Sequence, residues 1–465
     1  MRNTKSYKTG QKANGKRVLV VNPPNNPFSE KHLLIEPIDV LAVATFVQSL
    51  GHEVQVVDMD VKQMKPEDIK EVVDSFEPDV TVVPFDYHIP LHTTAAIDGV
   101  NKISEIARKG GSKVVVGGKT PKHFPEEFLG NCDVIINGEM EPVLKDLLFF
   151  SDWSSMQLNS VGGISFKSDR LYVTATRATM DIDSLPIPDR SLLDISDYID
   201  VRTMWTSRSC FGACKFCPTP GFWGRWRGRS AKLVVDEIEQ LISEGAKKVL
   251  FLDDNATVDK ERLQAICKGV VNRGLKVNLG CLGTIATQDE ETLKWMKKAG
   301  FSWMHYGAES GCSKMLKKMG KNITAEQTKE TLLATKKAGL RVRTSWIFDL
   351  PGTDEEVLRK TTQLILETEP DEIRAHFLAL RAGTDYYEEK GEGLTSQYIH
   401  SGKGAEGLTA RHVGKLTDEL LKRGYLVVKN TDDWKDVERL REKAPGLRFI
   451  AFCPARYGLN WEVKR

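Results

Sequence analysis

The sequence predicts an α/β protein with two successive βα-rich domains. The first is expected to be a doubly wound parallel sheet, and the second a partial (βα)6 barrel. Short β-branched runs alternate with helical stretches over residues 16–150, and the same rhythm returns over 203–390. The strands are continuously apolar, which is typical of parallel sheets covered by helices on both faces. Residues 151–202 interrupt the rhythm as a hairpin and linker, and 391–465 follow as a small C-terminal α/β extension.

The first domain is predicted from apolar runs that alternate with helical stretches. We expect strands at 18–21, 54–58, 80–84, 114–117 and 134–136, and helices at about 37–50, 66–76, 92–109 and 142–149. Pro66 suits a first helical turn, and Gly51 and Gly110 suit helix C-terminal caps. Residues 1–15 are polar and rich in lysine, and we expect them to form a disordered tail.

A ligand of such a sheet is expected beyond the carboxyl ends of its strands. The residues that fall at those ends are Asn22, Pro23, His88, Gly117, Gly118, Gly138 and Glu139. Gly117 and Gly118 lack side chains, so the backbone there could approach a bulky ligand closely. The sequence therefore predicts a ligand crevice at this edge of the first sheet.

The second domain is predicted from six βα units that follow the linker. A hairpin is expected at 163–166 and 171–174, and Pro186 and Pro188 predict an extended linker. We expect barrel strands at 203–206, 248–252, 275–281, 302–307, 341–348 and 372–379. In the C-terminal extension we expect helices near 408–423 and 433–443 and a strand at 447–452. Active residues of βα barrels gather at the carboxyl ends of the strands.

The overall composition is that of an ordinary globular protein. Hydrophobic residues make up 40% of the 465 residues, charged residues make up 28%, and the net charge is +2. This balance gives no electrostatic reason to expect a nucleic-acid or membrane partner. The N-terminal residues lack the apolar core of a secretory signal, and no run of about 18 apolar residues predicts a spanning helix. Cysteines without paired spacing fit a reducing compartment, so we expect a cytoplasmic protein.

Cys210, Cys214 and Cys217 form a CxxxCxxC pattern directly after the first predicted barrel strand. A loop with this spacing can surround three corners of a cubane iron–sulfur cluster, whose sites take thiolate ligands. The next cysteine is Cys267, so one iron would stay open to another ligand. The alternative is a structural zinc site, which usually needs two ligand pairs, and no second pair lies nearby.

The remaining cysteines lie mostly in apolar runs and are expected to be buried. They are Cys132, Cys267, Cys281, Cys312 and Cys453. Of these, Cys312 and Cys453 stay open as ligands of an auxiliary cluster.

Further short motifs accompany the cysteine pattern in a fixed order. They lie at 116–118, 124–127, 133–139, 229–238, 251–255, 299–301, 307–311, 350–352 and 383–384. With these motifs, the chain resembles the cobalamin-binding subfamily of the radical S-adenosylmethionine (SAM) enzymes over about 16–390. The resemblance implies a Rossmann-like cobalamin-binding domain at 16–150 and a radical SAM barrel at 203–390.

The resemblance also implies roles for individual residues. Cys210, Cys214 and Cys217 would hold a [4Fe-4S] cluster. The implied SAM contacts are Phe216 near the adenine, Asp253 and Asp254 at the amino group, Glu309 and Ser345 at the ribose or methionine part, and Lys321 at the carboxylate. The implied cobalamin contacts are Asn22, Pro23, His88, Gly117, Gly118, Gly138 and Glu139.

Several of these residues also have an ordinary structural interpretation, which stays open. Asp254 and the adjoining Asn255 would suit a helix N-cap. Lys321 would suit a solvated helix end, and His88 would suit an exposed loop.

The resemblance implies reductive cleavage of SAM to a 5′-deoxyadenosyl radical, followed most often by cobalamin-dependent C-methylation of a small molecule or natural product. The alternative is a radical deoxygenase, dehydratase or cyclase of the aminoglycoside or tetrapyrrole type, in some relatives without cobalamin. Expected partners are a small-molecule substrate and a low-potential one-electron donor such as flavodoxin or ferredoxin. A transfer-RNA methylthiotransferase and a non-enzymatic binding protein are less consistent with the motifs.

Three departures bear on cobalamin. No DxHxxG motif follows the first strand, so a histidine-ligated corrin is not expected. Lys119 follows the glycine pair close to where relatives often have a histidine, and Asp349 replaces the glycine common before Leu-Pro-Gly.

Overall fold

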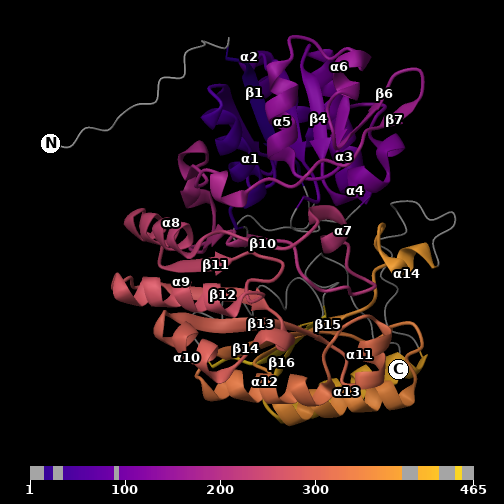
Figure 1. Ribbon diagram of the computed structural model, residues 1–465. Coiled ribbons are helices and arrows are strands. Elements are labelled where there is room, and N and C mark those ends of the chain that lie inside the picture. The colour runs from indigo at the N-terminus through magenta and orange to yellow at the C-terminus, as the bar shows by residue number, and fades with distance from the viewer. Residues whose placement is uncertain (1–14, 25–34, 88–93, 390–406, 429–445, 453–465) are drawn as a thin grey trace.

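The computed structural model describes residues 15–24, 35–87, 94–389, 407–428 and 446–452. It contains a seven-stranded sheet and an eight-stranded sheet. Figure 1 shows the domain of the first sheet stacked on the barrel, with the short helix α7 (Thr219–Trp223) at the junction. Within the described ranges, no helix has the length and apolar character to cross a membrane.

The first sheet has the strand order β2-β1-β3-β4-β5-β6-β7. Its strands are β1 (Arg17–Asn22), β2 (Glu53–Asp58), β3 (Val80–Pro84), β4 (Lys113–Gly117), β5 (Val134–Ile136), β6 (Ile164–Lys167) and β7 (Leu171–Val173). β1 to β5 pair in parallel, as predicted, and the hairpin β6–β7 adds two antiparallel strands to the edge. The strand order reverses at β1, which lies between β2 and β3, and such a switch point is where doubly wound sheets bind ligands.

Helices cover both faces of this sheet, so the central residues of its parallel strands are buried and mostly apolar. The helices are α1 (Ile38–Ser49), α2 (Ile69–Phe76), α3 (Thr94–Lys109), α4 (Lys119–His123), α5 (Met140–Phe149) and α6 (Ser155–Asn159). On β1, Val18 and Val20 pack in a core with α1 and α5, whereas Leu19 and Val21 pack in a second core with α2 and α3. This two-sided burial is the doubly wound arrangement that the sequence predicts.

The second sheet has the order β16-β17-β15-β14-β13-β12-β11-β8, and all its pairings are parallel. The six predicted strands are β8 (Arg202–Met204), β11 (Lys248–Phe251), β12 (Asn278–Gly283), β13 (Phe301–Glu309), β14 (Arg341–Ile347) and β15 (Glu372–His376). The C-terminal extension adds β16 (Leu426–Val428) and β17 (Phe449–Phe452). Of the sequence predictions, the helix at 433–443, the tail before residue 15 and Cys453 lie outside the described residues.

The barrel helices pack against the outer face of the second sheet. They are α8 (Ala231–Ser243), α9 (Lys260–Asn272), α10 (Glu290–Lys298), α11 (Ser313–Lys318), α12 (Ala325–Lys337), α13 (Glu355–Thr368) and α15 (Gly407–Lys422). The short helix α14 (Asp385–Glu388) lies beside the first domain, where the Tyr387 ring contacts that of Phe124 (Figure 1). On β13, Met304 and Tyr306 are buried in this outer core. The alternate residues Trp303 and His305 are only half-buried, because they point to the opposite, inner side of the barrel.

Candidate functional site

The cysteine loop follows the short strand β9 (Ser207–Arg208), which pairs with β10 (Arg227–Gly228). Ser209 has a φ of +75°, and this left-handed residue turns the chain into the loop. The sulfur atoms of Cys210 and Cys214 both lie 3.6 Å from the point where a side chain at Gly212 would begin. The backbone N–H of Cys217 donates to the carbonyl of Cys214 at 3.0 Å. A tight loop therefore directs the thiols toward a common space.

In the described part of the chain, the cysteine loop offers no ready-made site for a single metal ion. Across the ranges that the structure describes, no group of three or more His, Cys, Asp or Glu side chains could hold one metal ion. Zinc would need its thiolates about 3.8 Å apart, given a Zn–S distance of about 2.3 Å and tetrahedral geometry. Burial raises the pKa of Cys214 to about 11 and also raises the pKa of Cys217. These thiols therefore need the charge of bound iron to become thiolates.

Asn255 contacts the cysteine loop directly. Its side-chain N–H donates to the sulfur of Cys210 at 3.4 Å, while its side-chain oxygen accepts from the backbone N–H of Thr257 at 3.2 Å. The N-cap of the following helix α9 is Asp259. The helix-cap interpretation of Asp254 and Asn255 is therefore wrong. Asn255 instead bonds a predicted cluster ligand, and hydrogen bonds to the sulfurs affect the potential of a cluster.

The two aspartates after β11 have different surroundings. Asp253 is 1% exposed, and its carboxylate accepts hydrogen bonds from Thr206 and Ser207, just before the cysteine loop. Asp254 accepts one hydrogen bond, from Thr219 at 3.1 Å, and its other oxygen is buried without a hydrogen-bond partner among the described residues. The unpaired oxygen could accept from the SAM amino group, whereas Asp253 chiefly holds the segment that precedes the loop.

Glu309 and Lys321 form a buried ion pair beside the cysteine loop. The Lys321 ammonium lies 3.0 Å from the Glu309 carboxylate, and both side chains are nearly buried. Burial alone would lower the pKa of Lys321, but Glu309 and the nearby Cys214 thiol raise it. Two predicted SAM contacts are thus brought together within electrostatic range of Cys214, a predicted cluster ligand.

The remaining predicted SAM contacts lie inside the barrel and against its core. The Ser345 hydroxyl is within hydrogen-bond distance of His305 at 2.9 Å and His376 at 3.2 Å. Burial lowers the pKa of these histidines to about 3 and about 4, so both are neutral at pH 7. Phe216 packs, half-buried, against the barrel core. The contacts of Ser345 and Phe216 with SAM stay predictions.

The predicted cobalamin contacts differ in how accessible they are. Space beside Gly117 is taken by the Met140 side chain, and the backbone of Gly118 lies against that of Phe85. Gly138 is more open, with the carbonyl of Phe222 at 4.0 Å as its nearest neighbour. The glycine pair therefore serves close packing at the ends of β3, β4 and β5, and Gly138 is the glycine with room for a ligand.

The other predicted cobalamin contacts are polar or lie at the sheet edge. Asn22 donates to Asp58 at 2.8 Å, and Pro23 follows it at the end of β1. Glu139 accepts from Arg208 at 3.0 Å and from Arg227 at 2.9 Å. His88 lies outside the described residues.

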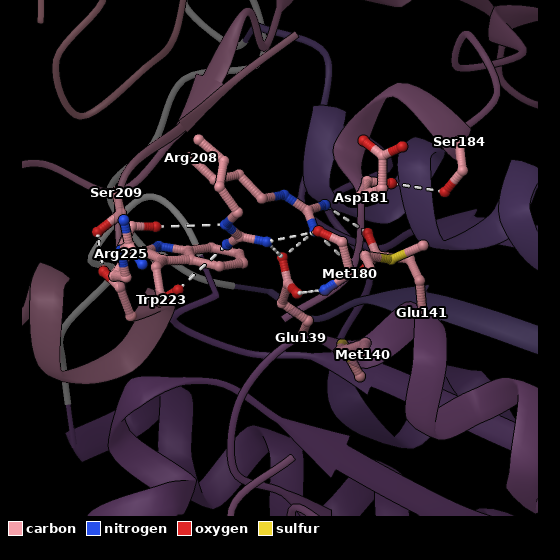
Figure 2. A network of polar contacts seen from close by, with 12 residues as sticks. Glu139, Met140, Glu141, Met180, Asp181, Ser184, Arg208, Ser209, Trp223 and Arg225 are labelled. Carbon is pink, nitrogen blue, oxygen red and sulfur yellow. Dashed lines mark hydrogen bonds and ion pairs between the residues drawn. The ribbon is translucent and has the colours of Figure 1, made fainter. Parts of the chain in front are cut away.

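Charged residues that the motifs left unassigned connect the two halves of the site. Arg208 pairs with Glu139 and Glu141 at the carboxyl edge of the first sheet, and Figure 2 shows its guanidinium directed toward them. Arg381 lies near enough for its charge to act on both Cys217 and Asp86. The position of Arg208, two residues before Cys210, indicates from the sequence that it lies near the site. Nothing in the sequence identifies its carboxylate partners.

Comparison with known families agrees with this geometry. Residues 206–365 match the radical SAM superfamily, and residues 32–148 match the B12 binding domain. An uncharacterized methyltransferase of Pyrococcus horikoshii, PH0819, is 26% identical over 387 residues, which are 80% of this chain and 82% of the relative. An anaerobic magnesium-protoporphyrin IX monomethyl ester cyclase of Cereibacter sphaeroides is 29% identical over 254 residues, which are 51% of this chain and 41% of the relative.

A solved structure shows the same two-domain fold. The radical SAM methyltransferase TsrM of Kitasatospora setae, with cobalamin and a [4Fe-4S] cluster bound, has a TM-score of 0.69 and 18% identity, covering 80% of this chain and 77% of that structure. The chain thus combines an N-terminal B12 binding domain with a radical SAM domain. Its cofactors are a [4Fe-4S] cluster, SAM and cobalamin.

Proposed function

We propose that the protein is a methyltransferase that moves a methyl group from SAM, by way of cobalamin, to a carbon atom of a small-molecule substrate. When bound, the cluster would supply one electron for the cleavage of SAM, and cobalamin would carry the methyl group. The observation that supports the proposal is the attachment of the cysteine loop to the carboxyl edge of the first sheet.

That attachment occurs on both sides of the loop. Before it, Arg208 pairs with Glu139 and Glu141, which directly follow β5. After it, α7 packs on the first domain, with Trp223 at 4.9 Å from the Tyr87 ring. A ligand above the first sheet and a ligand at the cluster would therefore face each other across α7.

The chain's own residues would act by binding, orienting and excluding water. Cys210, Cys214 and Cys217 would hold the cluster, and Glu309 with Lys321 would orient SAM beside it. The neutral pair His305 and His376, with Ser345 between them, would offer hydrogen bonds inside the barrel without adding charge.

The likeness to PH0819, which is aligned with 80% of this chain, supports methyl transfer. The extent of the match does not separate the two candidates, because anaerobic cyclases of Synechocystis and Rubrivivax gelatinosus are aligned with 80% and 77% of this chain. A radical cyclase, deoxygenase or dehydratase remains the second candidate, because a cyclase shares the matched region at 29% identity.

The test uses anaerobically reconstituted protein with hydroxocobalamin, a reductant and SAM. A methyltransferase should form S-adenosylhomocysteine only when corrin is present, in addition to 5′-deoxyadenosine. Formation of 5′-deoxyadenosine alone, equal with and without corrin, would favour the second candidate.

The matched control replaces Cys210, Cys214 and Cys217 by Ala. The parent should bind about four irons per chain, as a cubane does, and the triple variant should lose the iron and both SAM products. A full cluster in the triple variant would contradict the assignment of these ligands.

A further inference from the structure

Arg208 lies in a network of buried charges between the two domains. Its guanidinium is bidentate: one nitrogen lies 3.0 Å from Glu139 and 3.2 Å from Glu141, and the other lies 2.5 Å from the second oxygen of Glu141. The Arg208 and Glu141 side chains are 2% and 0% exposed. A forked contact of this kind fixes orientation as well as distance.

Aromatic rings hold the guanidinium from both sides. It lies 5.0 Å from the ring centroids of Trp205 and Trp223, which limits its freedom to rotate away from the carboxylates. The Tyr87 hydroxyl donates to Glu141 at 3.1 Å and accepts from the backbone N–H of Met140 at 2.9 Å. Figure 2 shows Arg208 between Trp223 and the two glutamates.

Arg208 connects the cysteine loop with the carboxyl edge of the first sheet, and the ligands of these two places must face each other. Arg208 is separated from Cys210 only by Ser209, whose hydroxyl also donates to the Gly224 carbonyl at 2.6 Å. Glu139 and Glu141 belong to the chain that leaves β5, beside the open Gly138. Any displacement of Arg208 is therefore passed to the cysteine loop over two peptide bonds.

The far end of the cysteine loop is attached to the same edge. α7 begins two residues after Cys217, and Phe222 meets the Tyr87 ring at 5.9 Å in an edge-on contact. From α4, Lys122 donates to the Gly221 carbonyl at 2.8 Å. The loop is thus held against the first domain at both ends, which leaves little freedom for the cluster to shift.

Stability alone does not account for this network. Replacing a buried ion pair with apolar or neutral residues of similar volume is often neutral or stabilising, because the desolvation cost disappears. Burial alone would raise the pKa of Glu141, but the Arg208 charge and the hydrogen bonds that Glu141 accepts, from Arg208 and Tyr87 among others, together lower that pKa, so the pair is ionised at neutral pH. What a charged fork adds over an apolar contact is directional constraint.

We propose that Arg208, acting through Glu139 and Glu141, is a positioning residue that fixes the cluster and the corrin at the separation needed for methyl transfer between SAM and cobalamin. The expected effect of Arg208 on methyl transfer rests on the proposed function. The fixed separation of the cluster and the corrin requires only that both cofactors are bound. Arg208 would touch neither cofactor; it would act through the cysteine loop and through the residues that follow β5.

The test variant is Arg208→Met with Glu141→Gln. It removes the ion pair without leaving an unpaired charge, because Glu139 keeps Arg227 at 2.9 Å and the glutamine still offers an oxygen to Tyr87. The matched control is Arg190→Met with Glu36→Gln. Arg190 and Glu36 form another buried ion pair between the domains, 3.0 Å apart, but Glu36 bonds Thr203 on β8 instead of the cysteine loop.

The first readout is spectroscopic and needs no substrate. Both variants and the parent are reconstituted with cluster and corrin, and the magnetic coupling between the reduced cluster and cob(II)alamin is measured by electron paramagnetic resonance. We expect a changed or broadened coupling in the Arg208 variant at unchanged iron and corrin content, and a parent-like coupling in the Arg190 control. A parent-like coupling in the Arg208 variant would overturn the proposal.

The second readout is the ratio of S-adenosylhomocysteine to 5′-deoxyadenosine. Only the first product requires the corrin to reach the SAM methyl group, so we expect the ratio to fall about 10- to 100-fold, the loss typical of a misplacement of about 1 Å. An equal fall of both products would show a merely structural role and would overturn the proposal. If the parent itself formed no S-adenosylhomocysteine, methyl transfer would fail, while the coupling measurement would still decide the positioning role.

A conservative variant covers the case in which the double variant does not fold. Arg208→Lys keeps the charge but not the fork, so we expect an unchanged melting temperature with a partly altered coupling. A parent-like coupling and product ratio in Arg208→Lys would contradict the need for a bidentate contact.

Discussion

Lys321 and Glu309 lie 3.0 Å apart, close enough to the cysteine loop for the Lys321 charge to act on Cys214. A side chain at Gly307 would collide with this pair, so the glycine is required for it. Glu309 itself has a φ of +62°, a conformation that a residue with a side chain rarely adopts. Backbone strain of this kind collects at ligand sites, and it accompanies the predicted SAM contact here.

Replacement of Glu309 by Gln should weaken SAM binding while the cluster stays intact. A hydrogen bond to a charged group is worth about 1.5–3 kcal/mol, so we expect about 10- to 150-fold weaker binding. Equilibrium binding of SAM, with the cluster followed by its visible absorbance, measures this. Glu326→Gln, an exposed change near α11, is the control, and an unchanged dissociation constant in Glu309→Gln would assign that residue a structural role.

Loss of the Asn255 amide should make the cluster harder to reduce. The amide donates to the Cys210 sulfur, and such a bond favours the more negative, reduced state. With a bond worth about 0.5–1.5 kcal/mol, Asn255→Ala should lower the potential by up to about 65 mV. A redox titration followed by electron paramagnetic resonance checks this against Asn272→Ala, an exposed change in α9. Equal potentials in the two variants would rule out the amide as a tuning group.

A larger side chain at Gly138 should displace the corrin without harming the fold. The position is open apart from the Phe222 carbonyl, so Gly138→Leu has room only where the ligand would lie. A steric cost of about 1–3 kcal/mol for the added leucine side chain against the corrin corresponds to about 5- to 150-fold weaker corrin binding. The retained corrin is measured after desalting, with Gly130→Leu as the control at another open glycine. Full retention by Gly138→Leu would place the corrin elsewhere. Gly117 is unsuitable for this test, because Met140 already fills its surroundings.

The two histidines inside the barrel, His305 and His376, should make the protein less stable in mild acid. Burial, with a further contribution from Arg374, lowers the pKa of His305 to about 3 and that of His376 to about 4, against about 6.5 when unfolded. Below pH 6.5 the unfolded chain therefore binds protons that the folded chain does not, and stability falls as the pH falls. From pH 6.5 to 5.5 the loss is about 1 kcal/mol for each histidine.

The measurement is the difference in unfolding free energy between these pH values under anaerobic conditions. The double variant His305→Gln with His376→Gln should show about 2 kcal/mol less pH dependence than the parent. His412→Gln, at another histidine, is the control. The same pH dependence in parent and double variant would contradict the neutral state of the pair.

Much of this arrangement follows from the sequence because its elements are local. Apolar runs such as Val80–Pro84 predict strands from the local sequence alone. The metal-binding role is likewise predicted from the local spacing of Cys210, Cys214 and Cys217. The partners of a buried charge are not local. Arg208 and Glu141 are far apart along the chain, and nothing in either neighbourhood indicates that the other completes the pair.

The glycines of the first domain show a second limit. Gly117 and Gly118 were predicted to admit a ligand, because glycine allows close approach of the backbone. The structure shows that their nearest neighbours are Met140 and Phe85. A missing side chain signals a close approach, but the sequence does not say whether a ligand or another part of the chain is approaching.

The parallel pairing of β15 with β17 has a consequence for how the chain reaches its final form. Glu372 pairs with Phe449 across a long intervening segment, so the edge of the barrel closes only after most of the chain has been synthesised. Until then one edge of β15 exposes unpaired backbone groups, which are a template for association with another chain. Contacts between such distant segments also form slowly, because loop closure must precede them. Nascent or truncated chains that lack Phe449–Phe452 should therefore be the aggregation-prone species during production of this protein.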